Sequence, residues 1–199
     1  MFNEKNNVMK KFTVPQLLKM FVILLVGFTL SSCSLDNPDI PPVKLENLPG
    51  NYKGRLITIQ GEIKKESIRS FKVKKDTITF EEFPINEIVK TVVKDPVKAE
   101  AALKALGKVK YNLQYKASIN TPNNVLELVF APETLTLQIP VDGTTKKTVV
   151  TLAAKQKGFY VGMDGSLRFS LIAEKITVDD AVLNPYEAIN YNFPFCIKS

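Results

Sequence analysis

The residues of this sequence with the clearest potential for chemistry are Ser31, Ser32 and Cys33, which follow a long apolar run. The Cys33 thiol is a nucleophile that can be alkylated, and the small serines leave the backbone before it accessible. Residues 20–30 carry no charged side chain, and three lysines precede them within residues 10–19. A basic start, an apolar core and a small-residue cleavage site together make a secretory signal. The stretch therefore predicts export and cleavage next to Cys33.

An ordinary transmembrane helix with an incidental cysteine is the alternative for this stretch. As a helix, residues 20–30 would span only about 17 Å, against a hydrocarbon core of about 30 Å. The short core and the basic residues before it favour a cleaved signal over a permanent span.

The sequence Leu30-Ser31-Ser32-Cys33 resembles the lipobox of bacterial lipoproteins. The resemblance implies that diacylglycerol is attached to the Cys33 thiol, that a dedicated peptidase cuts in front of Cys33, and that the new amino terminus is acylated. Two or more acyl chains would anchor the mature chain stably to a bacterial membrane. Asp36 and Asp39 only partly match the acidic cluster that marks surface export in Bacteroides-type lipoproteins. We therefore expect the mature protein to be attached to the outer membrane, and the sequence leaves undecided whether it faces the periplasm or the cell surface.

This interpretation divides the chain into a signal peptide (1–33), a flexible, proline-rich tether (34–49) and a single β-rich domain (50–199). The chain has 27 basic and 20 acidic side chains, of which 23 and 19 remain after residue 33. So small a surplus argues against a nucleic-acid partner. The remaining basic residues gather in 53–75, which is either a solvated strand face, the favoured interpretation, or a patch for an anionic ligand.

Several kinds of catalytic site are excluded by composition, because the sequence contains no histidine and only two cysteines. Ser-His and Cys-His nucleophiles and cysteine-rich zinc sites are therefore ruled out. The carboxylate pairs Glu81-Glu82 and Asp179-Asp180 have the residue types of a glycosidase, but neighbours on a strand point to opposite faces. We expect these pairs to be solvated at edges or turns. The sequence predicts no catalytic residue, no cofactor and no metal site, and hence no enzyme.

Strand patterns begin at residue 50, where Gly50-Asn-Tyr-Lys-Gly opens an alternating run. This opening resembles that of calycin-like barrel domains, and the arrangement recurs in exported lipoproteins of unknown function from Bacteroides-type bacteria. The small Gly50 and Gly54 would permit the close backbone approach that a closing barrel needs. Alternation of apolar and polar residues, with Asp-Gly turn signals, predicts further strands. Their ranges are 67–74, 77–83, 108–119, 125–131, 134–141, 146–154, 158–163, 166–178 and 189–197.

Two short helices are predicted between the third and fourth strands. Apolar residues recur at spacings of three and four from Ile85 to Val93. Asp95 as N-cap, Pro96 at the first helical position and Gly107 as the stop predict a second helix over 96–106.

The last strand is predicted to place Phe193, Phe195 and Ile197 on one inward face with Ile189 and Tyr191. Cys196 would then lie on the outer face, and it has no disulfide partner if Cys33 carries lipid.

The expected fold is mainly β, an antiparallel calycin-like barrel or rolled sandwich of about 9–10 strands, with two short helices around 85–106. The expected role is that of a lipid-anchored envelope protein that binds or scaffolds an unidentified protein or small molecule without catalysis. A carrier of a small apolar ligand inside the barrel is the alternative, and an envelope hydrolase is a third.

Overall fold

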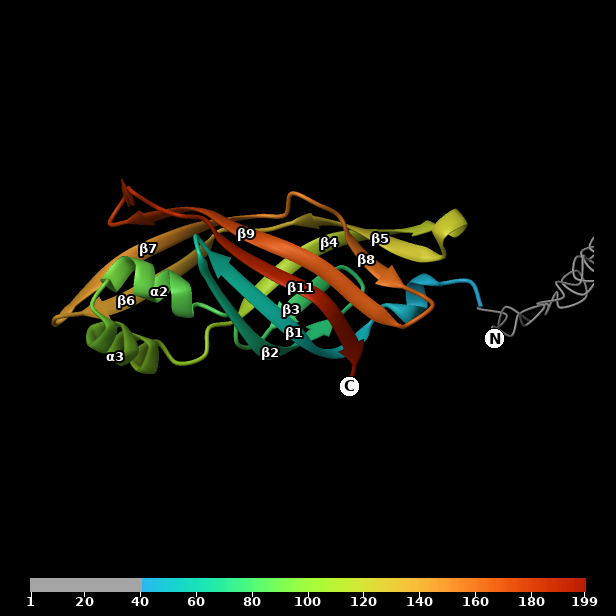
Figure 1. Cartoon of the computed structure of the whole chain (residues 1–199), viewed down its shortest axis with the longest axis horizontal. Helices are drawn as coiled ribbons and strands as arrows, with labels where there is room; N and C mark the ends of the chain where they lie inside the picture. The colour runs from blue at the N-terminus through green and yellow to red at the C-terminus, as the bar shows by residue number, and fades with distance from the viewer. Residues whose placement is uncertain (1–40) are drawn as a thin grey trace, which may run out of the picture. The chain divides into compact units, whose positions relative to one another are not determined.

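A computed structural model describes residues 41–199, and its strands form one antiparallel sheet, part of which closes into a barrel (Figure 1). The predicted signal peptide, the lipidation site at Cys33 and residues 34–40 of the predicted tether lie outside the described residues.

The described chain has eleven strands, two α-helices and two short 3-10 helices. The 3-10 helices are η1 (Leu45–Asn47) and η2 (Thr121–Asn123), and the α-helices are α2 (Asn86–Val93) and α3 (Pro96–Leu106). The strands are β1 (Gly50–Gln60), β2 (Ile63–Val73), β3 (Thr77–Phe80), β4 (Tyr111–Asn120), β5 (Val125–Ala131), β6 (Leu135–Val141), β7 (Thr144–Ala153), β8 (Gly158–Val161), β9 (Ser166–Val178), β10 (Ala181–Val182) and β11 (Ile189–Lys198).

Eight of these strands close into a ring in the order β11, β1, β2, β3, β4, β5, β8 and β9. The ring closes because β11 pairs antiparallel with β1 on one side and with β9 on the other. The predicted mainly β barrel with two short helices is therefore confirmed. Closure leaves no free strand edge around the ring itself, which removes the usual site of edge-to-edge aggregation.

The long strand β9 connects the ring to a two-strand extension. Its first residues, Ser166–Arg168, pair with β8, whereas Ile172–Val178 pair with β7. β6 pairs with β7 and forms the outer edge, where α3 packs against it. In Figure 1 the two helices lie beside β6, at the end of the molecule remote from β8.

Helix α3 has the start and stop signals from which it was predicted. The side chain of Asp95 accepts a hydrogen bond from the Lys98 backbone N–H at 3.0 Å, and Pro96 follows at the first helical position. Gly107 ends the helix with φ +62°, a left-handed conformation that glycine adopts without steric cost. α2 begins at Asn86, one residue after the predicted start, and has no side-chain cap.

The prediction for the last strand is wrong beyond Phe193. The pairing register of β11 with β9 shifts between Phe193 and Cys196, so the inward and outward positions exchange. Phe193 and Cys196 are fully buried, whereas Phe195 and Ile197 are 45% and 47% exposed. The prediction from simple alternation failed because one irregularity in a strand reverses the inward or outward direction of every side chain after it.

Gly54 lies opposite Cys196 in the pairing of β1 with β11. A Cβ atom built on Gly54 would lie 2.4 Å from the Cys196 Sγ and 2.6 Å from its Cα. The approach of the two backbones at the closure of the ring therefore requires glycine, as the opening strand pattern predicted.

The last residues before β1 pack against the barrel, where the sequence predicts a flexible tether. Val43 and Leu48 are buried in the core, and the Val43 backbone N–H donates to the Asn124 Oδ1 at 2.7 Å. These contacts show that the segment leading into β1 packs against the barrel, because its apolar side chains can be buried there.

Candidate functional site

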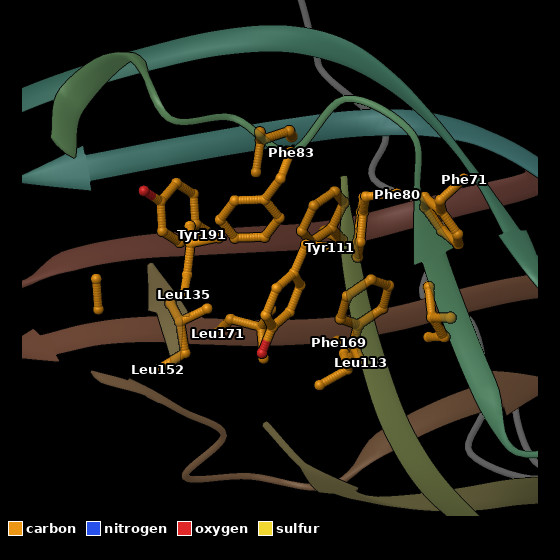
Figure 2. Close-up of a cluster of buried hydrophobic side chains, with 14 of the residues drawn as sticks. Phe71, Phe80, Phe83, Tyr111, Leu113, Leu135, Leu152, Phe169, Leu171 and Tyr191 are labelled. Atoms are coloured by element: carbon orange, nitrogen blue, oxygen red, sulfur yellow. The ribbon is translucent and has the colours of Figure 1, made fainter. Parts of the chain in front are cut away.

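The interior of the barrel is filled by aromatic side chains (Figure 2). The rings of Phe169 and Phe193 stack with centroids 4.5 Å apart, and Phe71 lies 5.2 Å from Phe80 and 5.6 Å from Phe169. Phe83 continues the cluster toward α2, 5.4 Å from the ring of Tyr191. Centroid distances of this kind are those of packed aromatic pairs, so this part of the interior is a core.

Tyrosine hydroxyls at the margin of this core bond to backbone carbonyls. The Tyr52 hydroxyl donates to Leu48 O at 2.7 Å, and the Tyr111 hydroxyl donates to Glu133 O at 2.9 Å. Burial raises the pKa of Tyr111 to about 12 and the pKa of Tyr186 to about 12. The Tyr191 hydroxyl is buried without a partner, and burial raises its pKa well above the ordinary value. These phenols stay protonated and act as structural groups at neutral pH.

A polar cleft of about 300 Å³ opens to solvent where α2 crosses the inner face of β1 and β2. Inward positions of the two strands are aromatic or aliphatic at Tyr52, Leu56 and Phe71, and become polar toward this cleft. We call it the α2–β2 cleft. Its lining residues are Thr58, Lys65, Glu66, Ser67, Arg69, Pro84, Asn86, Glu87 and Lys90.

Arg69 is the least satisfied group of the α2–β2 cleft. Its Nε is buried and has no hydrogen-bond partner, although the side chain is 26% exposed. The nearest carboxylate is that of Glu82, whose Oε1 lies 3.9 Å from Nη1, which is too long for a hydrogen bond. An arginine has five N–H donors in a planar fork that matches the oxygens of a carboxylate or phosphate. The cleft therefore has a donor group available for an oxyanion.

The remaining charges of the cleft are largely paired with one another. Lys65 Nζ lies 2.8 Å from the Glu87 Oε1, and Glu87 is buried. Lys90 Nζ lies 3.3 Å from the Glu100 Oε1 on α3. The first turn of α2 also lines the cleft, and its unpaired backbone N–H groups carry a partial positive charge. Arg69 is thus left as the cation with the weakest internal partner.

The structure divides the basic segment 53–75 between two faces. Lys53 and Lys72 are exposed on the outside of the barrel, whereas Lys65 and Arg69 line the α2–β2 cleft. The sequence offered a solvated face and a patch for an anionic ligand as alternatives, and the alternation of β2 places basic residues both on the outer surface and in the cleft. The pattern predicted the helix α2 itself, but it could not reveal that α2 lies beside these inner positions and forms a cleft with them.

The carboxylate pairs singled out in the sequence do not face each other across a cleft. Glu81 lies 3.3 Å from Lys110, and Asp180 lies 3.4 Å from Lys147. The Asp179 carboxylate accepts from the Lys147 backbone N–H at 2.9 Å. These contacts are of the edge and turn type that the sequence predicted. Within residues 41–199, no group of three or more histidine, cysteine, aspartate or glutamate side chains is placed to hold a metal ion.

The described residues contain a single cysteine, Cys196, and its thiol is buried. Burial raises the pKa of this thiol to about 12, so the reactive thiolate is suppressed at neutral pH. Among the helices of residues 41–199, none combines the length and the apolar character needed to cross a membrane.

Residues 47–178 match the family model of a domain of unknown function, DUF4840. The chain belongs to the DUF4840 family. No curated protein and no solved structure matches the chain. The DUF4840 match contains Lys65, Arg69 and Glu87 of the α2–β2 cleft, and it ends at the last residue of β9, before β11.

All six tyrosines of this DUF4840 protein have a raised pKa, chiefly because burial disfavours the phenolate. The unfolded chain ionises near the ordinary value of 10, while the folded chain keeps these protons to higher pH. The contribution of these tyrosines to the free energy of unfolding is therefore retained below pH 10 and falls as the pH rises from about 10 toward 12. We predict that tyrosinate absorbance develops together with loss of circular dichroism in an alkaline titration. Gradual ionisation near pH 10 in a still folded chain would contradict this.

Proposed function

We propose that this protein is an exported lipoprotein, anchored to the outer membrane through lipid on Cys33, that binds another envelope component without catalysis. We further propose that the α2–β2 cleft receives an oxyanion group of that component, a carboxylate, phosphate or sulfate. The function of DUF4840 domains is unknown, so the proposal depends on the lipobox-like sequence and on the geometry of the cleft.

The observation that supports binding is the unsatisfied Arg69 in an open, concave site. A buried donor without a partner costs free energy, about 1–3 kcal/mol in typical cases. An oxyanion in the cleft would accept from the exposed part of the Arg69 guanidinium and would be held further by the first turn of α2. The Lys65–Glu87 pair fixes one wall of the cleft and would keep α2 close to β2.

The packed interior bears on the alternative of an apolar-ligand carrier. A carrier needs an internal cavity of a few hundred Å³, and the aromatic cluster around Phe169 occupies the space where such a ligand would lie. We therefore propose an external binding site.

The anchor is tested by replacing Cys33. We predict that Cys33→Ala leaves the precursor without diacylglycerol and uncut, because only the thiol can be alkylated. Intact mass and membrane fractionation would show a full-length, unlipidated chain. Normal processing with efficient membrane retention in Cys33→Ala would contradict the proposal.

The cleft is tested by Arg69→Gln, which keeps the side-chain length close and removes the charge. We predict that phosphate, compared with chloride at equal ionic strength, raises the melting temperature of the wild type, since a ligand that binds the folded state stabilises it. Arg69→Gln should lose most of this increase.

Lys72→Gln is the matched control, because Lys72 lies on the same strand but on the outer face. It should keep the wild-type response to phosphate. An equal response in the wild type and in both variants would show that phosphate acts outside the α2–β2 cleft and would refute the assignment.

A further inference from the structure

The outer surface of β2, β1 and β11 carries three exposed apolar side chains side by side. Ile68, Phe195 and Ile197 are 56%, 45% and 47% exposed. They line a shallow hollow of about 580 Å³ together with Lys53, Arg55 and Lys198, and with Gly54 and Ser199. We call this surface the basic–apolar face.

The pairing register explains why these side chains are neighbours. Arg55 pairs with Ile68 on β2 and with Phe195 on β11, and Lys53 pairs with Ile197. The Gly54 backbone lies between Lys53 and Arg55 and also lines the hollow. The shift in β11 turns Phe195 and Ile197 outward, where the regular alternation would have buried them. The apolar surface is thus a product of the strand irregularity that closes the barrel.

The charged side chains that line the hollow are all cationic. Arg55 has a partner in Glu66 at 3.5 Å, and the Lys198 Nζ donates to the backbone O of Asn47. Outside the hollow, the Arg168 guanidinium lies 5.8 Å from the centroid of the Phe195 ring. Apolar side chains surrounded by lysine and arginine have the composition of surfaces that lie in the interface of a membrane with anionic lipids.

The basic–apolar face also borders η1, in the segment that leads into β1, whereas Pro41 lies beside Asn124, whose Nδ2 donates to the Pro41 O at 3.3 Å. The contact of Lys198 with Asn47 joins the face to η1, and the Ser199 backbone N–H donates to Asn51 O at 3.0 Å. From Cys33 to Pro41 the chain spans at most about 28 Å when fully extended. A lipid on Cys33 would therefore hold the domain close to the membrane surface, at a high effective concentration.

We propose that the basic–apolar face lies on a membrane surface that contains anionic phospholipid. Phe195, Ile197 and Ile68 enter the boundary between headgroups and acyl chains, and Lys53 and Arg55 contact lipid phosphates. The proposal rests on the lipid anchor at Cys33, which would bring the domain to the membrane. It gives the anchored barrel a defined orientation instead of free rotation on its tether.

The test uses the absence of tryptophan from the sequence. Phe195→Trp introduces a single fluorophore in the basic–apolar face, and Val129→Trp introduces one on β5, half-way around the ring. Val129 is 53% exposed, so both substitutions are made at half-exposed outer positions. The full chain, isolated with its native processing, is placed in vesicles of brominated phosphatidylcholine with or without phosphatidylglycerol.

We expect Trp fluorescence of the Phe195→Trp chain to be quenched about twofold or more relative to Val129→Trp in vesicles with phosphatidylglycerol. Adding Lys53→Gln and Arg55→Gln should weaken this quenching. Equal quenching of the two reporters overturns the proposal and leaves this face to a protein partner. Intact mass of the same samples reports lipid on Cys33 separately, so a failed anchor is distinguished from a failed membrane face.

Discussion

The closure of β11 against both β1 and β9 is the contact on which the rest of the barrel depends. At this closure the backbone of Gly54 approaches Cys196 so closely that a single added methyl group would collide with backbone and sulfur. The last strand accommodates the approach by shifting its register between Phe193 and Cys196. One local irregularity thus completes a ring whose strands come from both ends of the domain.

The register shift determines what faces inward and what faces outward. Before the shift, Tyr191 and Phe193 join the aromatic cluster, and this cluster fills the interior. After the shift, Phe195 and Ile197 are exposed beside the basic residues of β1. Because the interior of the barrel is packed, both sites that we propose for binding, the α2–β2 cleft and the basic–apolar face, are open to solvent.

Much of the fold could be predicted from the sequence because its signals are local. The strand at 50–60 follows from alternation, and the helix at 96–106 follows from Asp95, Pro96 and Gly107. The end of β11 could not be predicted, since the register shift depends on the pairing with β9 and β1. The sequence predicts a tether at Val43 and Leu48, since their burial depends on a barrel that lies later in the sequence.

The candidate site was predicted only in part. The basic character of residues 53–75 is visible in the sequence, and so is the alternation that separates Lys72 from Arg69. The cleft itself depends on α2 packing against β2, and no local pattern specifies that contact. The unpartnered Nε of Arg69 is likewise a property of the packed structure.

The direct test of this account is the reactivity of Cys196 toward Ellman's reagent in the folded Cys33→Ala chain, where Cys196 is the single thiol. With the shifted register the thiol is buried and its pKa is raised to about 12, so we predict no reaction until the chain is unfolded. Complete modification of the folded chain at the rate of the unfolded control would place Cys196 on the outer face. That result would contradict the register shift, the close approach of Gly54 and the exposed position of Phe195 together.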